Sequence, residues 1–229
     1  MAMRAAATFP DDAAFMWSNP NKQNRPGAHK AGMRAVGNVP RFVQPREALR
    51  RTVRRAGARG SKTPEDLRVE AQTAADALRD GAAALPLLAR KTWRGDRMAT
   101  MKDLDYLRWR YGHFHEYRAI ATDPPSRAGG MVIFRARRHG PLWVADVCEL
   151  LVEHGDRRTV RHLLRLVADA AATDFIRCKF SSRHHAASFG FLQTRGVTTL
   201  MTLPLKHSLT PDPARRTSWE LSHGDLELL

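Results

Sequence analysis

Apolar positions recur with the period of a helix or a strand through most of the chain after residue 98. Leu104, Leu107 and Tyr111 fall on one side of a predicted helix, and the segments that follow are short, apolar and separated by turn residues. One of them, "LWVADVCELLV", is apolar almost throughout, which favours a strand buried on both faces. The predicted elements are a helix at 101–112, strands at 116–122, 131–138 and 141–152, a helix at 157–173, a strand at 175–180, a helix at 182–196 and a strand at 197–206.

This order of elements indicates an α/β fold. We expect a mixed, mostly antiparallel twisted sheet with helices on both faces, formed by a domain at 98–229. Near the C-terminus, Trp219 and Leu221 are expected to pack inward.

The first 97 residues divide into two further regions. Residues 1–45 predict a short strand at 13–18, a short helix that Gly32 closes and an extended run after it. Pro40 and Pro45 are expected to limit the pairing of that run. Residues 46–97 read as a helical connector, with its clearest helix at 63–81.

The N-terminal region repeats the order of the C-terminal one. "RAAAT" ending at Thr8 precedes a strand, a loop and a glycine at 32, and "DAAAT" ending at Thr173 precedes the same elements and a glycine at 196. The two spans differ by one residue in length. We therefore interpret 1–45 as a partial copy of the C-terminal domain that lacks its opening strands, so that the chain would be a fragment or truncated product of a longer two-domain protein.

Composition narrows the class of protein only in part. The net charge of +15 suggests an acidic partner, but no helix carries a compact block of Lys and Arg with interleaved aromatics, so nucleic acid is the less favoured partner. The longest apolar run, Ala82 to Ala89, is too short to span a bilayer, and no secretory leader is evident, so a cytoplasmic protein is expected. Cys148 and Cys178 are expected to be reduced core thiols, and no Cys/His spacing indicates a zinc site.

The passage from Leu142 to Leu164 has a layout suited to an anion. A buried strand leads through the polar loop "EHGDRRT" into a helix, and the first amides of a helix have no partners inside the helix. Those amides and the helix dipole favour a bound anion. The alternative is an ordinary helix start with Asp156 as its N-cap.

Residues 98–221 resemble the GNAT superfamily, the Gcn5-related N-acetyltransferases. The similarity lies in the meander "EYRAIAT … MVIFRARR … PLWVADVCELLV", in the strand, loop and helix "VCELLVEHGDRRTVRHLLRLV", and in "FIRCKF … FLQTRGVTTLMTL". Chains of this kind that open with "LRWRYG" resemble tandem proteins associated with bacterial envelope polysaccharides, which suggests a bacterial source. Residues 1–45 resemble the second half of another such domain.

The resemblance implies a site for acetyl-coenzyme A as cosubstrate. In the family, the central strand parts from its neighbour, the pantetheine arm pairs with the exposed strand edge, and loop amides bind the pyrophosphate. The residues that the resemblance assigns to these contacts are Val147, Leu150, Val152, Gly155, Asp156, Arg157, Arg158 and Thr159. Two departures weaken the match: Arg157 stands where the family has a second small residue, and Asp156 places a negative charge beside the pyrophosphate, which Arg157 and Arg158 could offset.

Acyl transfer to an amine needs a base, and the family often adds a tyrosine acid near the end of the penultimate helix. The position that matches this tyrosine is Leu192, so no such acid is present there. The candidate bases are Glu149 and Asp146 on the third strand and His154 in the loop. Burial on a strand would raise the pKa of a carboxyl toward neutrality, which suits a base, whereas a solvent-facing strand end or loop is the plainer interpretation.

Three functions follow from these patterns. The first is an acetyl-coenzyme A (acyl-coenzyme A)-dependent N-acyltransferase that acts on a small amine or amino sugar by direct transfer. The second is a domain of this fold that has lost catalysis and serves as a binding or scaffold module, and the third is a basic nucleic-acid-binding protein. An incomplete first copy would also expose a sheet edge, which favours a homo-oligomer.

Overall fold

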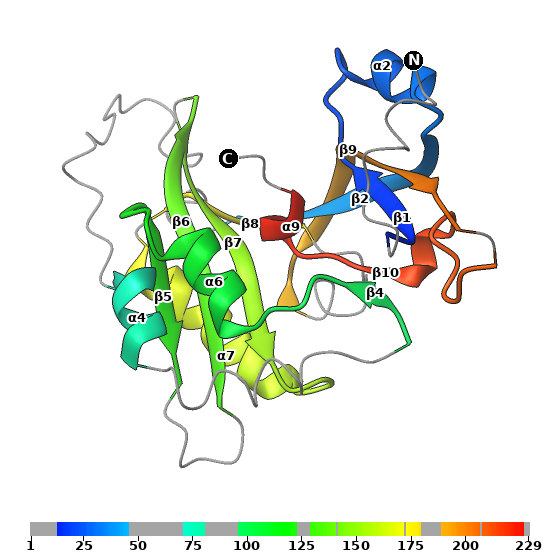
Figure 1. Ribbon diagram of the computed structural model, residues 1–229. Helices are drawn as coiled ribbons and strands as arrows, with labels where there is room; N and C mark the ends of the chain where they lie inside the picture. The colour runs from blue at the N-terminus through cyan, green and yellow to red at the C-terminus, as the bar shows by residue number, and fades with distance from the viewer. Residues whose placement is uncertain are drawn as a thin grey trace.

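An eight-stranded sheet organises the molecule (Figure 1). The computed structural model describes residues 13–45, 71–80, 96–122, 129–140, 142–171, 173–179, 189–206 and 208–226. The strand order is β1-β9-β2-β8-β7-β6-β5-β3, and β10 and β4 form a separate two-stranded sheet. The strands are β1 (Phe15–Ser18), β2 (Arg34–Pro45), β3 (Gln72–Thr73), β4 (Met98–Ala99), β5 (Tyr117–Ala121), β6 (Gly130–His139), β7 (Leu142–Val152), β8 (Phe175–Lys179), β9 (Leu192–Pro204) and β10 (Trp219–Glu220).

The helices lie on both faces of this sheet. They are α2 (Arg25–Lys30), α4 (Ala74–Asp80), α6 (Leu104–Tyr111), α7 (Arg157–Ala170), α9 (His223–Leu226) and the 3-10 turn η3 (Arg216–Ser218). In Figure 1, α4 and α6 lie in front of β5, β6 and β7, and α7 lies behind them. Within the eight-stranded sheet only β7 and β8 pair parallel, and every other pairing is antiparallel. The mixed, mostly antiparallel sheet expected from the sequence is therefore confirmed.

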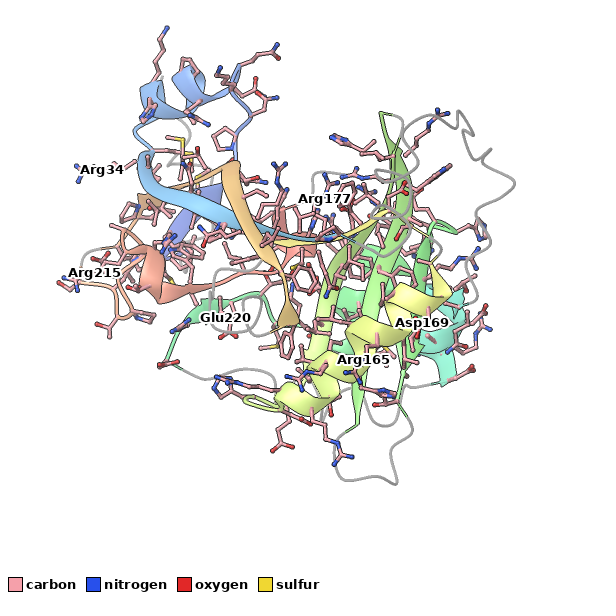
Figure 2. All side chains as sticks on the ribbon, turned by 180° about the vertical axis from the view of Figure 1, so that it is seen from behind. Arg34, Arg165, Asp169, Arg177, Arg215 and Glu220 are labelled. Atoms are coloured by element: carbon pink, nitrogen blue, oxygen red, sulfur yellow. The ribbon has the colours of Figure 1, made fainter. Side chains whose placement is uncertain are left out.

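The strands β5, β6 and β7 have a hydrophobic core on each face. The α7 side is filled by side chains such as Val132, Ala145, Val147 and Leu163. The α4 and α6 side is filled by others, among them Leu107, Tyr117, Ile133, Cys148 and Leu151. Amphipathic α7 explains this arrangement: Arg165 and Asp169, labelled in Figure 2, are exposed on the side away from the sheet, while Leu163 and Val167 are buried against it.

The N-terminal strands belong to the same sheet as the C-terminal ones. β2 lies between β8 and β9 and pairs antiparallel with both, and β1 pairs antiparallel with the outer side of β9. The expectation that prolines limit the pairing of β2 is wrong for the strand as a whole. Pro40 instead coincides with a shift of register between Val39 and Arg41, where a residue without an N–H is tolerated.

Two predicted helices differ from the structure. The helix predicted at 63–81 is interrupted, because Gln72 and Thr73 form strand β3 and the helix starts only at Ala74, with the Thr73 hydroxyl accepting from the Asp76 amide. The helix predicted at 182–196 cannot reach Gly196, because β9 begins at Leu192. Long β9 pairs with β2 over most of its length, and this tertiary pairing overrides the helical spacing. Residues 46–70, 81–95 and 180–188, which hold the rest of both predictions, lie outside the described residues.

Candidate functional site

The strands β7 and β8 part halfway along β7. They pair in parallel register from Val144 opposite Phe175 to Val147 opposite Cys178, and β7 then continues to Val152. Within the part of the chain that the structure describes, no strand pairs with Cys148–Val152 on the β8 side. A strand that continues past its parallel partner in this way can pair with an extended ligand.

A β-bulge marks the same point on the other side of β7. Ile133 of β6 lies opposite Glu149, but the next residue, Phe134, lies opposite Val147, so that Cys148 is an extra residue in β7. Ala145 and Val147 face α7 before the bulge, and Leu150 and Val152 face it afterwards. Without the extra residue, Glu149 would follow Val147 onto the α7 face. The bulge directs Glu149 to the α6 face instead.

Glu149 lies in a buried polar cluster on that face, which we call the Glu149 cluster: Glu149, Lys102, Tyr111 and Asp225. The Glu149 carboxylate accepts from the Tyr111 hydroxyl at 2.7 Å and from the Lys102 ammonium at 3.0 Å. The Lys102 ammonium also donates to Asp225 and to the Ser222 hydroxyl. Glu149 is 1% exposed and Tyr111 is 0% exposed, so these polar bonds are shielded from bulk water.

Burial sets the protonation behaviour of this cluster. It raises the pKa of the Glu149 carboxyl, and the nearby Asp225 carboxylate acts in the same direction, whereas Lys102 and Tyr111 act against them. Burial followed by the charge of Glu149 raises the pKa of the Tyr111 hydroxyl, which therefore remains a donor. Burial alone would lower the pKa of Lys102, but Glu149 and Asp225 outweigh it and raise that pKa. A carboxyl with a raised pKa next to a splayed strand has the properties of a general base.

Asp146 lies three residues before Glu149 on β7 and has a different role. Arg177 of β8 donates to both of its oxygens, at 2.5 and 2.9 Å, and Arg137 Nε lies 2.6 Å from Oδ2. Figure 2 labels Arg177 where the two groups of strands meet. With two guanidinium groups on a carboxylate that is 0% exposed, the geometry is that of a clamp across the last paired positions of β7 and β8.

The loop from Glu153 to Thr159 is closed on itself. Asp156 is the N-cap of α7: its carboxylate accepts from the Thr159 amide at 3.0 Å and from the Thr159 hydroxyl at 2.6 Å. The Asp156 and Arg157 amides donate to the carbonyls of Glu153 and Gly155. Gly155 has a φ of +87°, and a Cβ there would meet nothing within 4 Å. The N-cap expected under the alternative interpretation is therefore present, and the Asp156, Arg157 and Thr159 amides have partners inside the chain.

Hydrogen bonds stabilise the charged form of the Asp156 carboxylate. Although partial burial opposes it, hydrogen bonds from the side chain and amide of Thr159 and from the Arg158 amide lower the pKa of Asp156. The negative charge at this loop therefore persists near neutral pH. Arg157, Arg158 and His154 are exposed at the same end of the molecule.

Of the three predicted bases, Asp146 and Glu149 lie three positions apart on β7 and are both buried. His154 is exposed in the loop after β7. Leu192, the position that matches the family's tyrosine, lies on strand β9 and is 64% exposed, so the helix used to locate it does not exist there. Lys102, Tyr111 and Asp225 are the residues that sequence reasoning missed. They meet only through folding, because Tyr111 and Glu149 are 38 positions apart in the sequence and Lys102 and Asp225 are 123 positions apart.

No sequence model of a protein family matches the chain, and no curated protein matches it. Among the described residues, no helix has the length and apolar character needed to cross a membrane.

Solved structures do provide a match. The chain is similar to the crystal structure of a GCN5-related N-acetyltransferase from Anabaena variabilis, with a TM-score of 0.54 and 10% sequence identity. The similarity covers 90% of this chain and 48% of the other, so this chain spans about half the length of that protein. The chain therefore has the fold of the GCN5-related N-acetyltransferases, in agreement with the resemblance of its sequence patterns.

Proposed function

We propose that this protein is an acyl-coenzyme A-dependent N-acyltransferase that acts on a small amine or amino sugar by direct transfer. The observation that carries the proposal is the parting of β7 from β8 beside Glu149. It places the end of β7, which extends beyond its pairing with β8, beside a buried carboxyl whose pKa is raised. A fold match at 10% identity supports the general class but not the acceptor.

The coenzyme would use the end of β7. Its pantetheine arm carries amide groups, which would pair with the backbone of β7 beyond its last paired position with β8, as an added strand would. Its phosphates would lie near Gly155, where Arg157 and Arg158 are exposed and can pair with them. Asp156 opposes this placement, because its carboxylate holds the Thr159 amide and repels an anion.

Glu149 would serve as the base. In the reaction the amine nitrogen attacks the thioester carbonyl, the new C–N bond forms, the C–S bond breaks, and the thiolate leaves. The proton lost by the amine would pass to the Glu149 carboxylate, directly or through one water. Tyr111 and Lys102 would be positioning residues, since both bond to Oε1 of Glu149 and fix its orientation.

A thermal shift with acetyl-coenzyme A tests the proposal. Binding to the folded state raises the melting temperature, by about 2.7 kcal/mol of stabilisation at a hundredfold excess over Kd. Gly155→Val should abolish the shift, because a branched side chain is strained at φ +87° and projects into the space where we place the phosphates. Gly140→Val is the matched control, since Gly140 also has a positive φ, of +62°, and open space around its Cα, but lies in the turn before β7.

The outcomes separate the possibilities. Loss of the shift in Gly155→Val with retention in Gly140→Val supports the placement. Equal shifts in both variants would mean that the coenzyme binds elsewhere on the protein. Absence of a shift in the wild-type protein at millimolar ligand would reject the transferase proposal.

A second candidate function rests on the closed loop. The bonds that Asp156 makes to its own helix leave little capacity for a diphosphate, as expected of a domain that keeps the fold as a binding or scaffold module without transfer. Under this alternative acetyl-coenzyme A gives no thermal shift even in Asp156→Asn, which keeps a capping side chain but removes the charge.

We also propose that residues 13–45 are a partial copy of the region from β8 to β9. The pairing order β1-β9-β2-β8 reads the same when β1 is exchanged with β8 and β2 with β9. In both halves a strand is followed by a long strand that pairs with the other copy. A shift of about 160 positions moves Phe15 onto Phe175 and Pro45 onto Pro204, so the pair of Phe15 with Pro204 corresponds to the pair of Phe175 with Pro45. This shift is five positions shorter than the spacing between the two "AAAT" segments. An experimental structure in which β1 does not pair with β9 would remove this proposal.

A further inference from the structure

The short C-terminal helix α9 supplies Asp225 to the Glu149 cluster and lies directly on Tyr111 and Glu149. In Figure 1, α9 lies in the middle of the molecule, beside β7 and in front of β8. It follows β10, and its backbone packs most closely against β7 and next against β8. Thus α9 covers the α6-side face of the sheet at the place where the two strands part.

Gly224 makes the closest approach. A Cβ built on Gly224 would lie 1.9 Å from the Tyr111 hydroxyl and 2.3 Å from Oε1 of Glu149. Real side chains do not approach so closely, so only a glycine fits at this position. The backbone of α9 therefore seals the hydrogen bond between Tyr111 and Glu149 from above.

Polar bonds from several elements hold α9 in place. Lys102 Nζ donates to Asp225 and Ser222, and Arg110 donates to the Gly224 carbonyl at 2.9 Å. From the N-terminal region, the Asn19 amide donates to the Leu226 carbonyl at 2.5 Å. The Lys102 ammonium is shared between Asp225 on α9 and Glu149 on β7, so the same ion links the helix to the carboxyl beneath it.

We propose that α9 is a displaceable plug over Glu149, and that an acceptor amine reaches this carboxyl only when α9 moves away. As a statement about acyl transfer, the proposal rests on the function proposed above; as a statement about access to Glu149, it stands on the packing of Gly224 alone. Leu226 anchors the end of α9 in a hydrophobic cluster, but the helix has only four residues and is held by hydrogen bonds from separate elements, so it can open locally while the sheet stays folded. Opening would leave Lys102 with Glu149 and free the space above Oε1.

Chemical labelling of Glu149 tests the plug without any coenzyme. The probe is glycine ethyl ester coupled to carboxyl groups by a water-soluble carbodiimide, with the labelled peptides quantified by mass spectrometry. Asp146 is an internal control, because it is buried on the same strand but clamped by Arg177 and Arg137 rather than covered by α9. Its labelling reports global unfolding.

Gly224→Ala places a methyl group where Tyr111 and Glu149 already lie, and so forces α9 outward. We expect labelling of Glu149 to rise by about tenfold or more with Asp146 unchanged, as for a local opening. Gly27→Ala is the matched control, since Gly27 is in the short helix α2 with nothing within 4 Å of a built Cβ. If Gly224→Ala fails to fold, Asp225→Asn decides, because it removes one of the two carboxylates on Lys102 without a clash and should raise Glu149 labelling several-fold.

The labelling and binding results together decide whether α9 acts as a plug. The plug is overturned if Glu149 labelling in Gly224→Ala and Asp225→Asn stays at the wild-type level, or if Glu149 and Asp146 rise together in both. It is also overturned as a regulator if Gly224→Ala exposes Glu149, keeps the thermal shift with acetyl-coenzyme A, and releases coenzyme A with glucosamine no faster than wild type. Absence of that thermal shift in all variants would instead reject the transferase function, while the labelling still decides whether α9 covers Glu149.

Discussion

Two buried carboxylates on one strand, Asp146 and Glu149, have opposite surroundings. Asp146 lies where β7 and β8 are still paired and is held by two guanidinium groups. Glu149 lies beyond the bulge, where the strands have parted, and its partners are one lysine shared with Asp225 and one tyrosine hydroxyl. Both are almost completely buried.

The difference shows how one strand can hold two buried carboxylates in different surroundings within three residues. Arg177 comes from the neighbouring strand itself, so the Asp146 pairs join β7 to β8. The partners of Glu149 come from α6 and from the segment before it, and Lys102 joins them to Asp225 of the C-terminal helix, so that cluster can rearrange without breaking the sheet. A single extra residue, Cys148, creates the contrast by changing which face Glu149 occupies.

The largest expected effect is on stability at Asp146. Asp146→Ala leaves the Arg177 guanidinium, whose side chain is 11% exposed, without its carboxylate, and should cost about 3–5 kcal/mol of unfolding free energy, as for other broken buried pairs. Denaturant unfolding followed by circular dichroism measures it. Asp212→Ala, which breaks an exposed pair with Arg215, is the control and should change stability by less than about 0.5 kcal/mol. If Asp146→Ala and Asp212→Ala lowered the unfolding free energy equally, Asp146 would not act as a clamp between β7 and β8.

Glu149→Gln should act mainly on catalysis. Removing a general base lowers the rate by about 10²–10⁴-fold, while the amide keeps the shape of the side chain and the thermal shift with acetyl-coenzyme A persists. Release of coenzyme A from acetyl-coenzyme A with glucosamine as acceptor gives the rate. Glu153→Gln, in the exposed loop, is the matched control with an unchanged rate. A Glu149→Gln variant as fast as wild type would assign the base elsewhere.

Tyr111→Phe should weaken the Glu149 cluster without removing the base. Loss of a hydrogen bond to a charged, buried acceptor costs about 1.5–3 kcal/mol. Since the Tyr111 hydroxyl lowers the pKa of Glu149, its removal should raise that pKa further. Transfer falls as the pH drops through this pKa, because a protonated Glu149 cannot accept a proton, so the acid limb of the pH–rate profile should move to higher pH. An unmoved limb with the same loss of stability would make Tyr111 purely structural.

The smallest effect concerns Asp156 and pH. The folded pKa of Asp156 is lowered, so its stabilisation of α7 is fully present above the unfolded value of about 3.9 and is lost as the pH falls through the lower, folded value. Wild type should therefore melt about 1–2 °C above Asp156→Asn near neutral pH, and the two should converge in acid. Melting curves across the acid range measure this. A difference that persists at the lowest pH would show that charge on Asp156 is not what stabilises the helix.

Asp156→Asn also sharpens the comparison of the two candidate functions. If acetyl-coenzyme A binds near Gly155, removing one negative charge there should tighten binding by about three- to tenfold at moderate salt. Titration calorimetry gives the affinity. Unchanged affinity would place the phosphates away from this loop.

Local periodicity determined much of this protein. The strands β5, β6, β7 and β8 and the helices α6 and α7 follow from the spacing of apolar residues, and the cap at Asp156 follows from the type of residue before a helix, because these depend on neighbours in the chain. The sequence also nominated Glu149 as one of three bases, since a carboxylate inside an apolar strand is conspicuous.

Only the tertiary structure decided the rest. Strand pairing fixed β9 from Leu192 and replaced the predicted helix end at Gly196, and β3 interrupted the helix predicted at 63–81. It also gave β2 a central place in the sheet, where residues of β2 pair with residues at least 130 positions away. The bulge at Cys148 and the arrival of Lys102, Tyr111 and Asp225 around Glu149 depend on long-range packing, and no local pattern encodes a contact between residues 102 and 225. The chemistry of one carboxylate was thus set by contacts that form only when the chain closes on itself.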